Sequence, residues 1–341
     1  MLQLSVLRND PAFVKERLAV KHCKQLDLVD SIIALDDQRK KLQLDFDTTQ
    51  AKVNAASKEI GKMMASGNAA GAEAIKVEVA GWKESLDPIK TQMAEIETSL
   101  TNQLLQLPNL PGAPVPVGKT PEDNVVVKTG GPTASLPEGA APHWDLAKKY
   151  NLIDFDLGNK ITGSGFPVYR GKGAKLQRAL IQYFLDFNTA AGYTEYLPPF
   201  MVNEASALGT GQLPDKEGQM YYMKEDDFYM IPTAEVPLTN IYRDVILPGP
   251  DFSIKMCGYT PCFRREAGSY GKDVRGLNRL HQFDKVEIVR VEHPSNTAQA
   301  LEDMMEHVKG LLDKLGLQFR ILRLCGGDMG FASAMTYDFE V

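Results

Sequence analysis

Two apolar stripes separated by a turn signal dominate the first third of this sequence. In residues 28–60 apolar side chains recur at alternating steps of four and three, and residues 75–107 repeat the pattern. Heptad spacing of this kind keeps one face of a helix against a partner helix, as in a coiled coil. The segment between the stripes, residues 61–71, is rich in Gly, Ser and Asn, which favour turns. The pattern therefore predicts a long antiparallel helical hairpin.

The charge of this hairpin limits how it can bind RNA. Between residues 28 and 107 there are nine Lys and Arg residues against twelve Asp and Glu residues, so the hairpin is not a basic rod. An RNA-binding role must depend on particular side chains, and the candidates are Arg39, Lys40, Lys41 and Lys52. The simpler alternative is a dimerisation or spacer element, and composition leaves both readings open.

The composition excludes several classes of protein. The 341 residues are enough for about two domains, and 43% hydrophobic with 24% charged residues excludes a wholly disordered or fibrous protein. No apolar run approaches the roughly 18 residues that cross a bilayer, so no membrane association is expected. Four scattered cysteines are typical of a reducing compartment and predict a cytoplasmic location. The net charge of −6 argues against coating nucleic acid by bulk electrostatics.

A proline-rich segment ends the hairpin and marks a boundary. Four prolines fall within residues 108–116, where they forbid a helix and favour an extended connector. We therefore predict a helical arm (1–110), a linker (111–140) and a mixed domain (141–341). In that domain the patterning predicts helices at 174–187 and 293–315, and strands at 193–197, 221–223, 228–231, 258–263, 283–291 and 318–324. Strands with helices segregated between them predict an α+β fold on an antiparallel sheet.

The richest chemistry lies in two strand-like runs that flank a Gly/Ser/Asp/Lys loop. On the first run, Arg264 and Glu266 are two residues apart, so they are expected to share a face of the strand. On the returning run, Phe283, Lys285 and Glu287 share one parity and are candidates to lie across from them. A guanidinium, a carboxylate and an aromatic ring together suit the phosphate, amine and base of a nucleotide. The plain alternative is a solvated cross-strand salt bridge.

Two other kinds of site are not supported by the sequence. The glycine-containing segments 171–175 and 268–273 lack the span and the final Lys-Ser/Thr of a phosphate-binding P-loop. Cys257 and Cys262 have no second cysteine pair, and no His-x-x-x-His pair occurs. A zinc site is therefore not expected, and no metal ligand is assigned.

Two segments of the sequence, residues 264–287 and 233–235, resemble signatures of one enzyme class. Arg-x-Glu at 264–266, the following loop, Arg-x-x-x-Phe at 279–283 and the downstream Glu287 match motif 2 of the class II aminoacyl-tRNA synthetases. The Thr-Ala-Glu sequence at 233–235 resembles the serine-binding loop of the seryl-tRNA synthetases.

Further segments are similar to the same family, in the same order along the chain. Residues 192–199 resemble motif 1, whose strand builds a dimer interface, and residues 209–214 and 281–287 also look like this family. The hairpin resembles the family's N-terminal arm, which grips the long variable arm of serine tRNA. The resemblance implies that the mixed domain is a class II synthetase catalytic domain on an antiparallel sheet, and that the protein is a homodimer.

The resemblance implies a serine site built from four residues. Thr233 and Glu235 would hold the side chain and the ammonium of serine, with Ala234 contributing backbone atoms. Glu287 would complete the pocket, so that two carboxylates lie near one ammonium.

The resemblance also implies an ATP site. Arg264 would be catalytic, clamping the α-phosphate and stabilising the charge that develops when the serine carboxylate attacks it. Glu266 would read the adenine amino group, Phe283 would stack on adenine, and Leu280 and Arg265 complete the predicted site.

The implied reaction has two steps. Serine and ATP give seryl-adenylate and pyrophosphate, and the seryl group then passes to the 3′-terminal ribose of serine tRNA. Mg²⁺ would bridge the phosphates, and Arg275 is a candidate contact for a phosphate or for the tRNA acceptor end.

The sequence departs from the family at its end. The last residues, 336–341, stand where the family continues into a segment with a Mg²⁺- and ATP-binding glutamate and then into motif 3. We therefore expect a synthetase truncated before motif 3, and Glu340 is not assigned as a metal ligand. Three alternatives remain: a non-catalytic paralogue that binds tRNA or protein, another class II synthetase of the prolyl or threonyl type, and a helical scaffold without a ligand.

Overall fold

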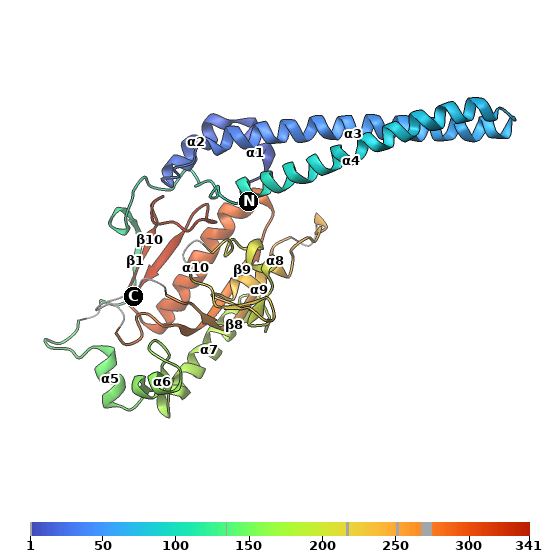
Figure 1. The fold of residues 1–341 in the computed structure, drawn as a ribbon. Coiled ribbons are helices and arrows are strands. Elements are labelled where there is room, and N and C mark those ends of the chain that lie inside the picture. The colour runs from blue at the N-terminus through green and yellow to red at the C-terminus, as the bar shows by residue number, and fades with distance from the viewer. Residues whose placement is uncertain (1, 134, 216–217, 250–251, 267–274) are drawn as a thin grey trace. The chain divides into compact units, whose positions relative to one another are not determined.

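The computed structural model describes residues 2–133, 135–215, 218–249, 252–266 and 275–341. The chain forms two compact units, one of Met1–Val126 with Leu322–Asp338 and the other of Val127–Ile321 with Phe339–Val341. Figure 1 shows the elements of each unit along the chain. Within the described residues, no helix combines the length and the apolar character that crossing a membrane requires.

The first unit is mainly helical. Its helices are α1 (Leu4–Asn9), α2 (Pro11–Val20), α3 (Leu28–Ala65) and α4 (Ala69–Leu104), and a short 3₁₀ helix (Pro121–Asp123) follows. Helix α2 begins with a capping residue, because the Asp10 carboxylate accepts a hydrogen bond of 2.9 Å from the Phe13 amide. Helix α1 was not predicted, since Gln3 before it makes no side-chain cap to mark its start.

The predicted helical hairpin is confirmed. Helices α3 and α4 run side by side in opposite directions (Figure 1), and α3 with 38 residues is about 57 Å long. Both apolar stripes meet in a buried seam of Val53, Ala56, Val79 and Leu86. The turn is shorter than predicted: α3 continues to Ala65, and α4 begins directly after Asn68, whose side chain caps it by accepting from the Gly71 amide at 3.0 Å.

A second apolar cluster closes the base of the hairpin. Helices α1 and α2 pack their apolar faces against the start of α3 and the end of α4, which buries Leu7, Val14, Leu18, Val29, Ile32, Leu100, Leu104 and Leu107. This cluster draws on all four helices and so joins α1 and α2 to the base of the hairpin.

The second unit combines short helices with antiparallel strands. Its helices are α5 (His143–Lys149), α6 (Phe155–Ile161), α7 (Lys172–Ala190), α8 (Glu204–Gly209), α9 (Glu235–Asn240) and α10 (Thr297–Leu315). Its strands are β2 (Ile153–Asp154), β3 (Val168–Tyr169), β4 (Thr194–Glu195), β5 (Met201–Val202), β6 (Tyr222–Met223), β7 (Phe228–Met230), β8 (Ile254–Phe263) and β9 (Gln282–Val291). Strands β1 (Val125–Gly130), β10 (Phe319–Arg323) and β11 (Tyr337–Glu340) form a sheet in the order β1-β10-β11.

The sheet that positions the site has the order β4-β8-β9. Strand β4 is parallel to β8, and β8 pairs with β9 along ten residues in antiparallel register, from Ile254 opposite Val291 to Phe263 opposite Gln282. The smaller sheets are β5-β7-β6 and β2-β3. The predicted α+β class and each predicted strand region are confirmed.

The two faces of the β8–β9 pair have different neighbours. On one face, Cys257, Tyr259, Val286 and Ile288 pack against Leu185 of α7 and form a core. The alternate residues, which include Phe283, Lys285 and Glu287, lie on the other face because successive side chains of a strand point to opposite sides. The predicted common parity of these three residues is therefore confirmed.

Candidate active site

The segment 231–234 brings a hydroxyl group to the open face of β9. Its backbone is fastened to the end of β8, where the Phe263 amide donates to the Ile231 carbonyl at 2.8 Å. Thr233 and Ala234 are buried directly before α9 begins at Glu235. This segment therefore presents Thr233 from a fixed backbone.

Thr233, Lys285 and Glu287 form one hydrogen-bonded cluster. The Thr233 hydroxyl donates to Glu287 Oε2 at 2.8 Å and accepts from Lys285 Nζ at 2.9 Å. Lys285 Nζ also lies 2.6 Å from Glu287 Oε2 in an ion pair. The carboxylate of Glu287 is thus already neutralised by an ammonium of the protein itself.

Glu235 is the second carboxylate of this region and has a different environment. It is exposed at the N-terminus of α9. Desolvation by the surrounding protein, followed by the charge of Glu287, raises its pKa, while Lys285 and Arg264 act in the opposite direction. Glu235 therefore takes up a proton more readily than an ordinary glutamate, and a bound cation would relieve this cost.

Arg264 is held over the aromatic ring of Phe283. Its guanidinium carbon lies 5.1 Å from the ring centroid, a cation–π distance, and its Nε donates to the Pro232 carbonyl at 3.2 Å. Among the described residues this is its only guanidinium hydrogen bond, so the two Nη groups remain for a ligand. A planar fork of donors of this kind matches a phosphate.

His281 fixes the backbone of Arg264. The Arg264 amide donates to the His281 carbonyl at 2.9 Å, and His281 Nδ1 donates back to the Arg264 carbonyl at 2.9 Å. The imidazole stacks on Phe166 at 5.3 Å, and it lies so close to Gly165 that a Cβ there would be 2.5 Å from the ring. The glycine at this position therefore makes room for the side chain that positions Arg264.

Glu266 does not lie on a strand, contrary to prediction. Strand β8 ends at Phe263, and Glu266 adopts φ +47°, so the expectation that it shares a strand face with Arg264 is wrong. Two bonds to Gln219 hold this turn: the Arg265 amide donates to its carbonyl at 2.9 Å and the Glu266 amide to its side chain at 3.0 Å. The Glu266 carboxylate pairs with Arg279 Nη1 at 2.6 Å.

A cleft of about 600 Å³ joins four of the five residues predicted to bind ATP. Its lining consists of Arg264, Glu266, Leu277, Asn278, Arg279, Leu280 and Phe283. Arg265 is not among these residues. Arg275 is exposed, and residues 267–274 of the predicted loop lie outside the described residues.

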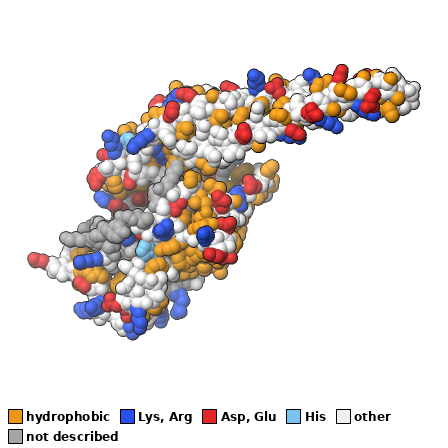
Figure 2. Space-filling model, viewed as in Figure 1, with side chains coloured by type: hydrophobic (Ala, Val, Ile, Leu, Met, Phe, Trp, Pro, Cys, Tyr) orange, Lys and Arg blue, Asp and Glu red, His pale blue; other side chains and the backbone are white. Residues whose placement is uncertain are grey.

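The candidate RNA-binding cations of the arm fall into two groups. Arg39 and Lys40 both bind Asp36, at 2.7 and 3.0 Å, and Arg8 joins them at 2.9 Å. Burial alone would raise the pKa of Asp36, but the hydrogen bonds from Arg39 and Lys40 outweigh it and hold the pKa below its usual value. Lys41 and Lys52 are exposed. Figure 2 shows side chains of both signs scattered along the arm.

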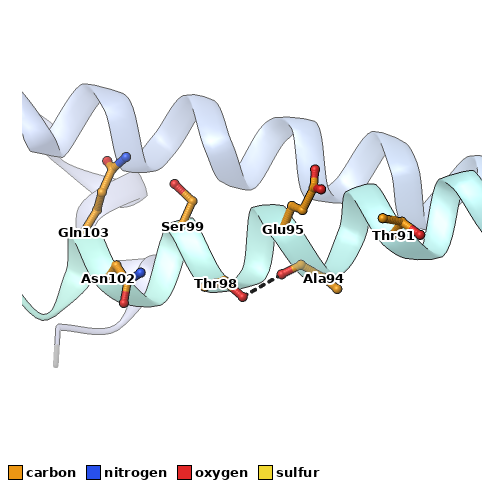
Figure 3. Close-up of a pocket in the computed structure, with 7 residues that line it drawn as sticks. All are labelled: Thr91, Ala94, Glu95, Thr98, Ser99, Asn102 and Gln103. Carbon is orange, nitrogen blue, oxygen red and sulfur yellow. Dashed lines mark hydrogen bonds between the residues drawn. The ribbon is translucent and has the colours of Figure 1, made fainter.

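A shallow groove of about 670 Å³ lies on α4 (Figure 3). It is lined by Thr91, Ala94, Glu95, Thr98, Ser99, Asn102 and Gln103. Its one charged side chain is acidic, so the groove does not suit a phosphate, and its lining includes neither a cation nor an aromatic ring.

Comparison with known proteins identifies the family. The profile described as "Seryl-tRNA synthetase N-terminal domain" matches residues 1–111, and that of the "tRNA synthetase class II core domain (G, H, P, S and T)" matches residues 221–341. The serine--tRNA ligase of Salinibacter ruber is 48% identical over all 341 residues, which cover 80% of that relative. The chain belongs to the seryl-tRNA synthetases.

Other relatives agree with this membership. The serine--tRNA ligase of Akkermansia muciniphila is 43% identical over 100% of the chain and 80% of the relative. The crystal structure of seryl-tRNA synthetase from Pyrococcus horikoshii complexed with ATP superimposes with a TM-score of 0.90 at 28% identity, covering 100% of this chain and 80% of that one. These findings replace the prolyl, threonyl and ligand-free scaffold alternatives.

Four residues of this synthetase site had no predicted role. They are Gln219, Arg279, His281 and Lys285, and each binds a residue whose type did suggest a role. The parity of the β9 strand placed Lys285 on the site face, which was the one available signal for it. The pairing of Gln219 with a turn about 47 residues later in sequence had no such signal.

Proposed function

We propose that this chain activates L-serine with ATP, giving seryl-adenylate and pyrophosphate, and then transfers the seryl group to the 3′-terminal ribose of serine tRNA. The observation that carries the proposal is the pairing of two sites on adjacent segments. The cluster of Thr233, Lys285 and Glu287 suits a small polar amino acid, and the cleft around Arg264 and Phe283 suits a nucleotide.

The ATP site follows from the lining of the cleft. The ring of Phe283 offers a stacking surface for adenine, and Leu280 adds apolar contact. Glu266 uses Oε2 for Arg279, which leaves Oε1 to accept from the adenine amino group. The ATP-complexed synthetase of Pyrococcus horikoshii supports a nucleotide as the ligand.

Arg264 has the central role in the chemical step. As the serine carboxylate oxygen attacks the α-phosphorus and the bond to pyrophosphate breaks, negative charge spreads over the α-phosphate oxygens. The two Nη groups of Arg264 stabilise that charge without reorganising, because Phe283, Pro232 and His281 already hold the side chain and its backbone.

Serine would bind between the two carboxylates. Glu235 takes the ammonium, since desolvation and the charge of Glu287 raise its pKa and a bound cation would offset both effects, and Glu287 and the backbone of Ala234 complete the pocket. Among the described residues no group of three His, Cys, Asp or Glu side chains could hold a metal ion. Mg²⁺ therefore stays a prediction from the resemblance, and no step described above depends on it.

The proposed partners are serine tRNA and a second copy of the chain. The arm would contact the variable arm of the tRNA through exposed cations such as Lys41 and Lys52, and Arg275 is proposed for the acceptor end or a phosphate. The segment that resembles motif 1 would form the dimer interface. Arg39 and Lys40 contribute less in this proposal because Asp36 already binds them.

The test is serine-dependent exchange of labelled pyrophosphate into ATP. Exchange should occur with the product of the gene's full reading frame, and Arg264→Gln in that product should lower its rate by about 100-fold or more, as when one donor to a developing oxyanion is lost. The matched control is Arg178→Gln, a substitution on α7 outside the site, which should leave the rate unchanged. Exchange driven by another amino acid, or tRNA binding with no exchange at all, would contradict the proposal; the latter result favours the non-catalytic paralogue.

A further inference from the structure

We propose that His143 is a positioning residue for the ATP site: it holds the start of the segment 277–280, which forms one wall of the nucleotide cleft. This inference rests on the proposed function and deepens it, because it gives helix α5 a role in nucleotide binding although α5 lies outside the segments that resemble the family's motifs. His143 is not among the residues that line the cleft, so it acts through the wall and not on the ligand.

The wall segment has no regular secondary structure. Residues 277–280 form an irregular stretch before β9 begins at Gln282, and all four of them line the cleft. Backbone groups of such a stretch are not paired within a helix or a sheet, so they need partners elsewhere in the protein. The position of the wall therefore depends on the bonds that fasten its ends.

Both ends of the wall are fastened to the part of the chain that precedes α7. At the start, the Leu277 amide donates to Nε2 of His143 at 2.8 Å. At the other end, the His281 amide donates to the Gly165 carbonyl at 2.9 Å, and the His281 ring stacks on Phe166. The first of these bonds uses a side chain as the acceptor, so a substitution can remove it without changing the backbone.

The contact with Leu277 requires one form of the histidine. A backbone amide can only donate, so Nε2 of His143 accepts and carries no proton. The imidazole lies at the N-terminus of α5, edge-on to the ring of Trp144 with 5.0 Å between the ring centroids. A side chain without an acceptor at this position would leave the Leu277 amide without its partner.

Gly276 makes room for this histidine. A Cβ at Gly276 would lie 3.0 Å from two carbons of the His143 ring and closer still to Nε2. Gly276 also adopts φ +66°, a left-handed conformation that glycine reaches without steric cost. Both the space and the backbone angle at Gly276 therefore favour the bond that the next residue makes.

The wall suits the nucleoside part of ATP. The charge of its one cation, Arg279, is offset by Glu266 at 2.6 Å, and its other three side chains are uncharged. The phosphates are therefore left to Arg264, and the wall adds contacts beside the ring of Phe283. Because ATP and AMP share adenine and ribose, binding of the two nucleotides should depend on His143 to the same extent.

The experiment uses the product of the gene's full reading frame and compares His143→Phe with the wild type. Calorimetry gives the Kd for ATP and for AMP, and serine-dependent pyrophosphate exchange gives the KM values. We expect His143→Phe, which keeps a ring but removes the acceptor, to raise both Kd values and the KM for ATP about 3- to 10-fold, as when one hydrogen bond is lost. The KM for serine should change by less than about twofold, since the amino acid does not contact the wall.

Two further variants separate the hydrogen bond from the shape of the side chain. His143→Gln should restore most of the nucleotide affinity, because its amide oxygen can accept near the position of Nε2. Gly276→Ala should weaken ATP binding in the wild type, where the new methyl group presses on the imidazole. It should weaken binding less in His143→Ala, because residues in contact give non-additive effects.

The matched control is His293→Phe. Nδ1 of His293 also accepts from a backbone amide, that of Ser295 at 3.3 Å, and its ring also lies edge-on to an aromatic neighbour, Phe252. His293 is not among the residues that line the cleft. This substitution should leave the nucleotide affinities and the exchange rate unchanged.

The results decide between this role and its absence. An unchanged Kd for ATP in His143→Phe, or an equal rise in the KM for serine and for ATP, would overturn the inference. His143→Gln that binds ATP as weakly as His143→Phe would also overturn it. Wild-type protein that binds ATP without serine-dependent exchange would contradict the proposed function alone, and the ATP affinities would still decide the role of His143. Wild-type protein that binds no ATP would overturn both.

Discussion

Neighbouring side chains give the two carboxylates of this site, Glu235 and Glu287, different environments. Glu287 shares an oxygen between Thr233 and Lys285, whereas Glu235 is exposed and has a raised pKa. The two arginines differ in the same way: among the described residues the Nη groups of Arg264 have no hydrogen-bond partner, whereas Arg279 is paired with Glu266. At the scale of the residue, the role of each group is therefore decided by what already binds it.

Glu235→Gln tests this distinction. We expect the serine KM to rise about 10-fold or more, because the charged partner of the ammonium is lost. The pKa of Glu235 is raised in the wild type, so this carboxylate becomes protonated at a higher pH than an ordinary glutamate. As the pH is lowered, serine affinity should therefore begin to fall at that higher pH. Serine KM values measured between about pH 5 and pH 8 check this expectation, and an unchanged profile in the variant would contradict it.

The same variant, Glu235→Gln, should be more stable than the wild type although it binds serine less well. A carboxyl whose native pKa is raised destabilises the native state once the pH rises through that pKa, so Glu235→Gln should raise the free energy of unfolding at neutral pH. The gain should vanish at about pH 3, where the carboxyl is protonated in both states. Urea unfolding of the wild type and of Glu235→Gln, at neutral pH and at the acidic pH, measures the difference in the free energy of unfolding.

Among the secondary-structure elements, some were predicted from the sequence and others depend on contacts that it does not reveal. The heptad stripes predicted the hairpin because one periodicity dictates one buried seam. The turn that carries Glu266 away from the strand face was missed, since nothing local in the residues after Phe263 announces the hydrogen bonds to Gln219 that hold it. The packing of His281 against Gly165 could not be predicted either, because this contact joins segments that are distant in sequence.

The arm gives a prediction of its own. The double variant Lys41→Glu with Lys52→Glu should weaken binding of serine tRNA and leave serine-dependent exchange unchanged, since the arm and the reaction site belong to separate compact units. The slope of log affinity against log salt should become shallower by about 1 for each lysine that no longer pairs with a phosphate. Filter binding at several salt concentrations measures both effects, and unaltered tRNA affinity would remove these lysines from the interface.

Several large apolar side chains near strand β4 are exposed to solvent in the single chain. Leu197, in the segment that resembles motif 1, is 76% exposed, and Phe200 and Met201 beside it are also exposed. Strand β4 of this segment is at the edge of its sheet, with β8 as its neighbour. Exposed apolar groups at a sheet edge are typical of an interface between subunits.

Leu197→Asp should therefore shift the protein from dimer to monomer, because it places a charge in the proposed interface. Leu136→Asp is the matched control, as Leu136 is 80% exposed but lies outside the motif 1 segment. Sedimentation velocity distinguishes the two states. A wild-type monomer, or an equal effect of both substitutions, would contradict a motif 1 interface.

The base of the arm also has a mechanical consequence. A stiff rod about 57 Å long acts as a lever, so a rotation of only about 5° at its base displaces its tip by about 5 Å, the size of a full helical turn. Near that base, Arg8, Arg39 and Lys40 all grip the one carboxylate of Asp36. Of these three cations only Arg8 lies on another helix, and it also pairs with Asp37, so one arginine of α1 braces α3 at the end where a small rotation has its largest effect on the tip.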